Sequence, residues 1–105
     1  MFEVLLRGRI RVGDAVPADT MLRPARDVLM AERDGVAVLL DLRREVYLGL
    51  DEIGTVAWRE IENGASAESV TRRVCEEYDA PADSVRADML VFVTELRRRR
   101  LVVCA

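Results

Sequence analysis

Alternating hydrophobic and polar positions are clearest in residues 45–50. Val46 and Leu48 fall on one face of an extended chain there, whereas Glu45 and Tyr47 fall on the other. This alternation predicts a half-buried β-strand whose Val46 and Leu48 side chains face the core. The strand passes directly into a helix-like pattern, with no linker between the two.

Two earlier runs have the composition of strands. Residues 28–33 and 36–42 flank Asp34-Gly35, a pair typical of a two-residue turn between antiparallel strands. The run 36–42 is apolar on both faces, which indicates a central position in a sheet. We therefore expect a three-stranded antiparallel meander with residues 45–50 as its third strand.

Three runs with apolar residues at helical spacing follow the meander. The first covers residues 52–62 after an Asp51 N-cap, the second runs from a Ser66 N-cap to residue 78, and the third covers residues 84–99. A meander followed by three helices predicts a small α+β domain with one shared core. Trp58 adjoins the apolar face of the first helix, so we expect it in that core.

The first 21 residues form an extension to the expected domain, which covers residues 22–105. We expect residues 1–12 to form one or two short strands and residues 13–27 to form an irregular connector. Three roles are open for the extension: to add a strand, to cover a sheet edge, or to exchange between two copies. Two assembly states therefore stay open, a monomer and a strand-swapped homodimer.

The composition is that of an ordinary soluble protein. Of the 105 residues, 50% are hydrophobic and 33% are charged. No apolar run approaches the roughly 18 residues that a membrane helix needs, and the first residues lack the pattern of a signal peptide. We therefore expect a cytoplasmic protein that binds no membrane. The net charge of −3 also disfavours a dedicated nucleic-acid binder.

The sequence offers little chemistry for catalysis. It contains no histidine, so the usual base for a serine or cysteine nucleophile is missing. Cys75 and Cys104 lack the spacing of metal ligands and are interpreted as buried or incidental thiols. No glycine-rich phosphate loop is present. We expect no catalytic residue, no metal and no cofactor, and hence no enzyme.

Four consecutive arginines, residues 97–100, fall at the end of the third predicted helix. Cations there interact favourably with the helix dipole and with the last carbonyl groups. We favour this structural role. The alternative is an anchor for phosphate or for acidic residues of a partner.

Over about residues 22–103 the chain resembles PqqD and its relatives, the peptide-recognition proteins of ribosomal peptide natural-product pathways, including those for lasso peptides. The resemblance rests on three segments in order: "GVAVLLDLRREVYLGLDEIGTVAWREIENG", "SAESVTRRVCEEYDA" and "VRADMLVFVTELRRRRLV". It implies a winged-helix-like fold of three strands and three helices without catalytic activity. It also implies that the chain binds the leader region of a precursor peptide and delivers it to a modifying enzyme or leader peptidase.

The resemblance further implies where the leader binds. The leader would lie as an added antiparallel strand against the third strand, in a groove walled by the third helix. Asp88 and Glu95 would meet its basic or hydroxyl groups, while Tyr47, Val91 and Phe92 would contact its apolar anchors. The implied site residues are Glu45, Val46, Tyr47, Leu48, Asp88, Val91, Phe92 and Glu95.

Three of these assignments carry a qualification. Val46 and Leu48 are expected to act only through their backbone, because their side chains should face the core. Phe92 fits a purely structural place in the core equally well. The family commonly has a glycine in the turn before the third strand, where this chain has Arg43-Arg44-Glu45, so the register of the edge stays open by one residue.

Two other functions remain open. In a winged-helix transcription regulator, a helix would enter the major groove of DNA and the arginines would contact phosphate. A protein–protein subunit that never meets a leader fits the sequence almost equally well. Salt distinguishes the regulator, because DNA affinity falls steeply with salt whereas apolar strand addition responds weakly.

Overall fold

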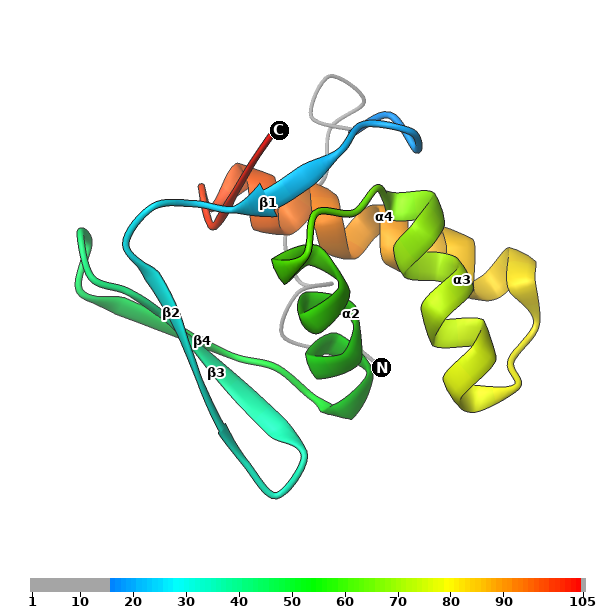
Figure 1. Ribbon diagram of the computed structural model, residues 1–105, viewed down its shortest axis with the longest axis horizontal. Coiled ribbons are helices and arrows are strands. Elements are labelled where there is room, and N and C mark those ends of the chain that lie inside the picture. The colour runs from blue at the N-terminus through cyan, green and yellow to red at the C-terminus, as the bar shows by residue number, and fades with distance from the viewer. Residues whose placement is uncertain (1–15, 105) are drawn as a thin grey trace.

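The chain folds into an α+β unit in which a β-meander precedes three helices (Figure 1). The computed structural model describes residues 16–104. Strands β2 (Val28–Arg33), β3 (Val36–Asp41) and β4 (Val46–Gly49) come before helices α2 (Glu52–Glu62), α3 (Ala67–Tyr78) and α4 (Ala82–Arg98). The fold class predicted from the sequence is therefore confirmed.

The three strands form an antiparallel sheet in the order β2-β3-β4, so β3 is central as predicted. Asp34 and Gly35 both have positive φ angles, 55° and 83°, which is the geometry of a two-residue type I′ turn. Ala37 and Leu39 of β3 are buried toward the helices. The opposite face of β3 is only partly covered, since Val36 is exposed. Hydrophobic residues on both faces of β3 therefore do not mean burial on both faces.

Strand β4 is joined directly to α2, and hydrogen bonds to β3 hold this joint. The Leu50 N–H donates to the Ala37 carbonyl at 2.8 Å. Asp51 caps α2 as predicted, accepting from the Gly54 N–H at 2.7 Å. The Thr55 hydroxyl accepts from the Ala37 N–H at 2.9 Å and donates to the Asp51 carbonyl at 2.8 Å. The first turn of α2 is thereby fixed to the central strand.

Two further short strands are present, and the first lies within residues 13–27, where an irregular connector was expected. Strand β1 (Leu22–Pro24) pairs antiparallel with β5 (Val102–Cys104), although the two strands are far apart in the sequence. Leu22 is fully buried and exchanges two backbone hydrogen bonds with Ala65. Strands of three residues are too short to show a periodic pattern, so the sequence did not reveal them. The strands expected within residues 1–12 lie outside the described residues.

The helices pack their apolar faces around one core. Ser66 caps α3 as predicted, in a capping box with Ser69. Helix α4 begins at Ala82, two residues before the expected start. Trp58 of α2 and Phe92 of α4 are both fully buried, so the prediction that Trp58 belongs to the core is confirmed. Among residues 16–104, no helix is long and apolar enough to cross a membrane.

Candidate functional site

Strand β4 forms one edge of the three-stranded sheet. Within the described chain it pairs with β3 on one side only. In antiparallel sheets, hydrogen-bonded and non-hydrogen-bonded residue pairs alternate along the two strands. The hydrogen bond from Leu50 to Ala37 therefore shows which residues of β4 bond to β3 and which do not. The backbone N–H and C=O groups of Tyr47 and Gly49 therefore point toward the open edge. These groups can pair with another extended chain.

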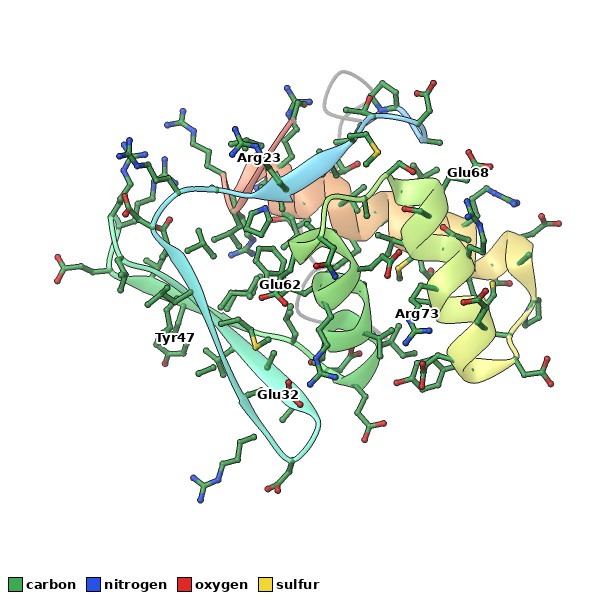
Figure 2. All side chains as sticks on the ribbon, viewed as in Figure 1. Arg23, Glu32, Tyr47, Glu62, Glu68 and Arg73 are labelled. Atoms are coloured by element: carbon green, nitrogen blue, oxygen red, sulfur yellow. The ribbon has the colours of Figure 1, made fainter. Side chains whose placement is uncertain are left out.

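A pocket of about 410 Å³ lies beside this edge. Leu39, Leu48 and Leu101 form its apolar base, and all three side chains are buried. Val46 and Tyr47 stand on its rim with 53% and 76% of their surface exposed. Figure 2 shows Tyr47 on the sheet, far from the labelled residues of α3. Exposed large hydrophobic side chains around an apolar hollow are typical of a docking site.

The prediction that the Val46 side chain is part of the core is wrong, because the side chain is exposed. Val46 lies on the same face of the sheet as Leu48, which is buried as expected. The space over Val46, however, belongs to the pocket instead of being filled by packed side chains. Val46 therefore offers an apolar side chain to this pocket as well as its backbone.

The turn between β3 and β4 is built around the buried carboxylate of Asp41. Its Oδ1 accepts from the backbone N–H groups of Arg43 and Arg44 at 3.0 and 3.3 Å. Its Oδ2 pairs with the Arg44 guanidinium at 3.3 Å. The same Arg44 Nη1 donates to the Arg99 carbonyl at 3.4 Å, which ties the turn to the end of α4. The two sides of the pocket are thus held together at this end.

Glu45 lies in this turn and not in the strand, contrary to the expected strand start. Its φ angle is 55°, in the left-handed region that usually favours glycine. Asp41 pairs with Val46, so residues 42–45 form the connection. Glu45 therefore adopts a backbone conformation that usually requires glycine. The pairing of Asp41 with Val46 defines the register of the edge strand.

The four consecutive arginines end α4, as the favoured interpretation predicted. Arg100 has a φ angle of 60°, the Arg100 N–H bonds to the Arg97 carbonyl, and the Leu101 N–H bonds to the Leu96 carbonyl. This pair of bonds is a Schellman motif, which satisfies carbonyls at a helix end. The motif turns the chain so that Arg98, Arg99, Arg100 and Leu101 line the pocket.

The α4 residues expected in the site do not line this pocket. Phe92 is fully buried in the core. Glu95 is also fully buried, and its carboxylate pairs with Arg98 at 3.6 Å and with Arg99 at 2.7 Å. Asp88 and Val91 are half-buried in earlier turns of α4. Whether these four residues take part in binding stays a prediction.

The structure brings together Val46, Tyr47 and Leu48 from the predicted set, and it adds residues that sequence reasoning missed. Gly49 was missed because only the pattern of hydrogen bonds between β3 and β4 shows that its backbone N–H and C=O groups point away from β3. Arg44 was missed because its role depends on contacts across the fold. The run of arginines was noticed, but a charge run alone does not reveal that it borders an apolar hollow. Among residues 16–104, no group of His, Cys, Asp and Glu is arranged to hold a metal ion.

Three solved structures match this chain, with similar TM-scores. A structure described as TbiB1 in complex with the TbiA(β) leader peptide is 30% identical, with a TM-score of 0.71, covering 76% of this chain and 93% of that one. A lasso peptide synthetase B1 complexed with the leader peptide is 23% identical, with a TM-score of 0.69, covering 78% and 96%.

The third match is the PqqD truncation of PqqCD from Methylobacterium extorquens, a stand-alone recognition element for ribosomally synthesised and post-translationally modified peptides. It is 18% identical, with a TM-score of 0.71, covering 86% of this chain and 96% of that one. The comparison with curated proteins gave no significant match. The family model of PqqD, coenzyme PQQ synthesis protein D, matches residues 37–102. The chain belongs to the PqqD family.

Proposed function

We propose that this chain binds the leader region of a ribosomally synthesised precursor peptide and presents it to a peptide-modifying enzyme or leader peptidase. The leader adds to β4 as an antiparallel strand and places apolar side chains in the adjoining pocket. The chain performs no chemistry of its own. The observation that carries this proposal is the open edge of β4 beside an apolar hollow.

Relatives support the choice of ligand. TbiB1, the match with 30% identity, was solved with a leader peptide bound. The absence of histidine from the whole sequence removes the commonest general base, which supports a binding role. Strand addition also fits the outward backbone groups at Tyr47 and Gly49, because main-chain hydrogen bonds supply affinity and side-chain pockets supply selectivity.

The predicted site residues take different roles within this proposal. Tyr47 and Val46 contact the leader directly from the rim of the pocket. Glu95 acts indirectly, by holding Arg98 and Arg99 at the pocket wall. Phe92 supports α4 from within the core. The half-buried Asp88 and Val91 extend the wall toward the start of α4. Glu45 extends the edge, and Leu48 belongs to the base of the pocket.

The proposal is tested by fluorescence anisotropy with the labelled leader of a candidate precursor peptide. Tyr47→Asp places a charge on the rim and should weaken binding at least about tenfold, the loss typical of a central aromatic contact. The fold should be unaffected because Tyr47 is largely exposed. A scrambled leader serves as the control ligand. Equal affinity for Tyr47→Asp and the native chain would contradict the proposed groove.

Strand addition itself is tested at Gly49. Gly49→Pro removes an outward N–H without removing a bond to β3 and should abolish leader binding. Gly49→Ala is the matched control, since a Cβ at this position meets no atom within 4 Å. A duplex DNA titrated under the same conditions tests the regulator alternative. Salt-sensitive binding of DNA without binding of leader would overturn the proposal.

A further inference from the structure

A second pocket of about 520 Å³ adjoins the groove beside β4. Both pockets are lined by Arg44 and Arg100, so the two hollows adjoin at these side chains. The second pocket is also lined by Arg26 from the segment before β2, Arg43 from the β3–β4 turn and Arg97 from α4. Five arginines from three separate parts of the chain therefore converge at one end of the groove.

Within residues 16–104, carboxylates do not balance these positive charges. Asp41 is the one carboxylate that lines this pocket, and it already accepts from the Arg44 guanidinium and two backbone N–H groups. Arg26, Arg43, Arg97 and Arg100 form no ion pair with any carboxylate among the described residues. In contrast, several arginines elsewhere are paired, such as Arg59 with Glu32 and Arg86 with Asp83.

The imbalance stands out because the chain as a whole is acidic, with a net charge of −3. Clustered guanidinium groups repel one another, and a ligand carrying carboxylates relieves that repulsion. Arginine also binds carboxylates through paired N–H donors, which gives a planar and directional contact. The pocket therefore has the charge and the donors for an acidic peptide segment.

The direction of the added strand decides which part of the ligand reaches this pocket. Strand β4 runs from Val46, beside the arginines, to Gly49, beside α2. All neighbouring strands in this sheet are antiparallel, and a peptide that continues this arrangement runs from Gly49 toward Val46. Its residues after the paired stretch then leave the edge near Arg44 and Arg100, beyond which lies the second pocket with Arg43 and Arg97.

We propose that the peptide ligand carries carboxylate side chains immediately C-terminal to the stretch that pairs with β4, and that Arg43, Arg97 and Arg100 bind them. This inference rests on the proposed function and adds the chemistry of the ligand's flanking segment. Arg43 precedes Val46 by three residues, a span that an extended ligand matches at roughly 3.4 Å per residue. The carboxylates therefore fall within about four residues of the last paired residue.

The test uses a displayed library of random peptides selected on the native chain. Enriched peptides should combine an apolar anchor with Asp or Glu on its C-terminal side. Arg43→Glu together with Arg97→Glu should instead select Lys or Arg at the same positions. The control pair, Arg33→Glu with Arg72→Glu, changes two exposed arginines outside both pockets by the same charge and should keep the acidic preference.

Affinity measurements make the test independent of whether the charge-reversed variant folds. Arg43→Gln with Arg97→Gln should bind a selected acidic peptide roughly three- to thirtyfold more weakly, the sum of two partly exposed charge pairs. Added salt should narrow that difference. Replacement of the peptide's Asp and Glu by Asn and Gln should reproduce the loss on the native chain.

The outcomes separate this inference from the proposed function. Peptides that need Gly49 and Tyr47 for binding but show no acidic preference would overturn the inference alone. A library that yields no binding peptide would overturn the proposed function and the inference with it. Loss of duplex DNA binding in Arg43→Gln with Arg97→Gln, without a change in peptide affinity, would assign the arginines to a nucleic acid and overturn the inference.

Discussion

Arg44 reaches from the β3–β4 turn to the last turn of α4, where its Nη1 donates to the carbonyl oxygen of Arg99 at 3.4 Å. The same guanidinium pairs with the buried carboxylate of Asp41. Arg44 therefore fixes the separation between the sheet edge and the helix end that border the groove. Replacement of Arg44 by a shorter side chain would break its contacts with Asp41 and Arg99 and loosen this end of the groove.

We expect Arg44→Gln to lower the free energy of unfolding by about 1 kcal/mol, because the Asp41 carboxylate loses a charged partner that is itself partly exposed. Chemical denaturation measures this change. Arg33→Gln is the control, since Arg33 lies at the exposed end of β2 and makes no ion pair within the described chain. The assignment of Arg44 as a structural tie would be wrong if both variants were equally stable.

The Thr55 hydroxyl bridges α2 and β3, so its removal should expose a specific backbone group. Thr55→Val keeps the shape of the side chain but leaves the buried Ala37 N–H without an acceptor, at a cost of about 1–3 kcal/mol in unfolding free energy. Amide hydrogen exchange at Ala37 should accelerate relative to its neighbours. Thr55→Ser retains the acceptor and should keep Ala37 protected. Unchanged exchange in Thr55→Val would contradict the bridge.

The left-handed conformation of Glu45 predicts a stabilising substitution. Glu45→Gly should raise the free energy of unfolding by about 0.5–1 kcal/mol, because glycine adopts this conformation without the contact between Cβ and the backbone that strains other residues. Glu45→Ala keeps a Cβ and should change stability little. Thermal or chemical denaturation of the three proteins gives the comparison. A destabilised Glu45→Gly variant would contradict this prediction, because it would show that the Glu45 side chain stabilises the fold by more than its backbone strain destabilises it.

Tyr78 at the end of α3 predicts a pH dependence. Burial, followed by the charges of Glu52, Glu77 and Asp51, raises the pKa of its hydroxyl above the usual value. The neutral hydroxyl is thus favoured in the folded state, so this contribution to stability is complete below the unfolded pKa of about 10 and is lost as pH rises through the folded pKa. Tyr47→Phe leaves Tyr78 as the one tyrosine of the chain, and ultraviolet titration of that variant follows it directly. Glu52→Gln should lower the midpoint, and a midpoint at the ordinary value would exclude this burial effect.

The meander and the helices could be predicted because turns and helix caps are specified by residues that are adjacent in the sequence. Residues 28–33 and their Asp34-Gly35 turn are found where the pattern placed them, since that turn demands residues that tolerate positive φ. Asp51 and Ser66 are the caps that they were predicted to be. Features of this kind depend only on neighbours along the chain.

Features that depend on distant contacts were not predictable in the same way. Strand β1 exists because Leu22 meets Cys104 and Ala65, which no local pattern can reveal. Val46 has the spacing of a core residue, but the end of α4 leaves a hollow above it. Likewise, the wall of the pocket comes from residues 98–101 because a Schellman turn redirects the chain, whereas helical periodicity pointed to residues earlier in α4.

The pairing of β1 with β5 has a consequence for how this domain can be built into larger proteins. Leu22 and Cys104 are opposite each other, and these two strands do not pair with the meander. The chain therefore enters and leaves the part formed by the meander and the three helices at points only one strand spacing apart, roughly 5 Å. A host protein could carry the unit as a cassette spliced into a surface loop with little disturbance of its own backbone. A tether attached after Cys104 would pull on the β1–β5 pairing and leave the edge of β4 unstrained.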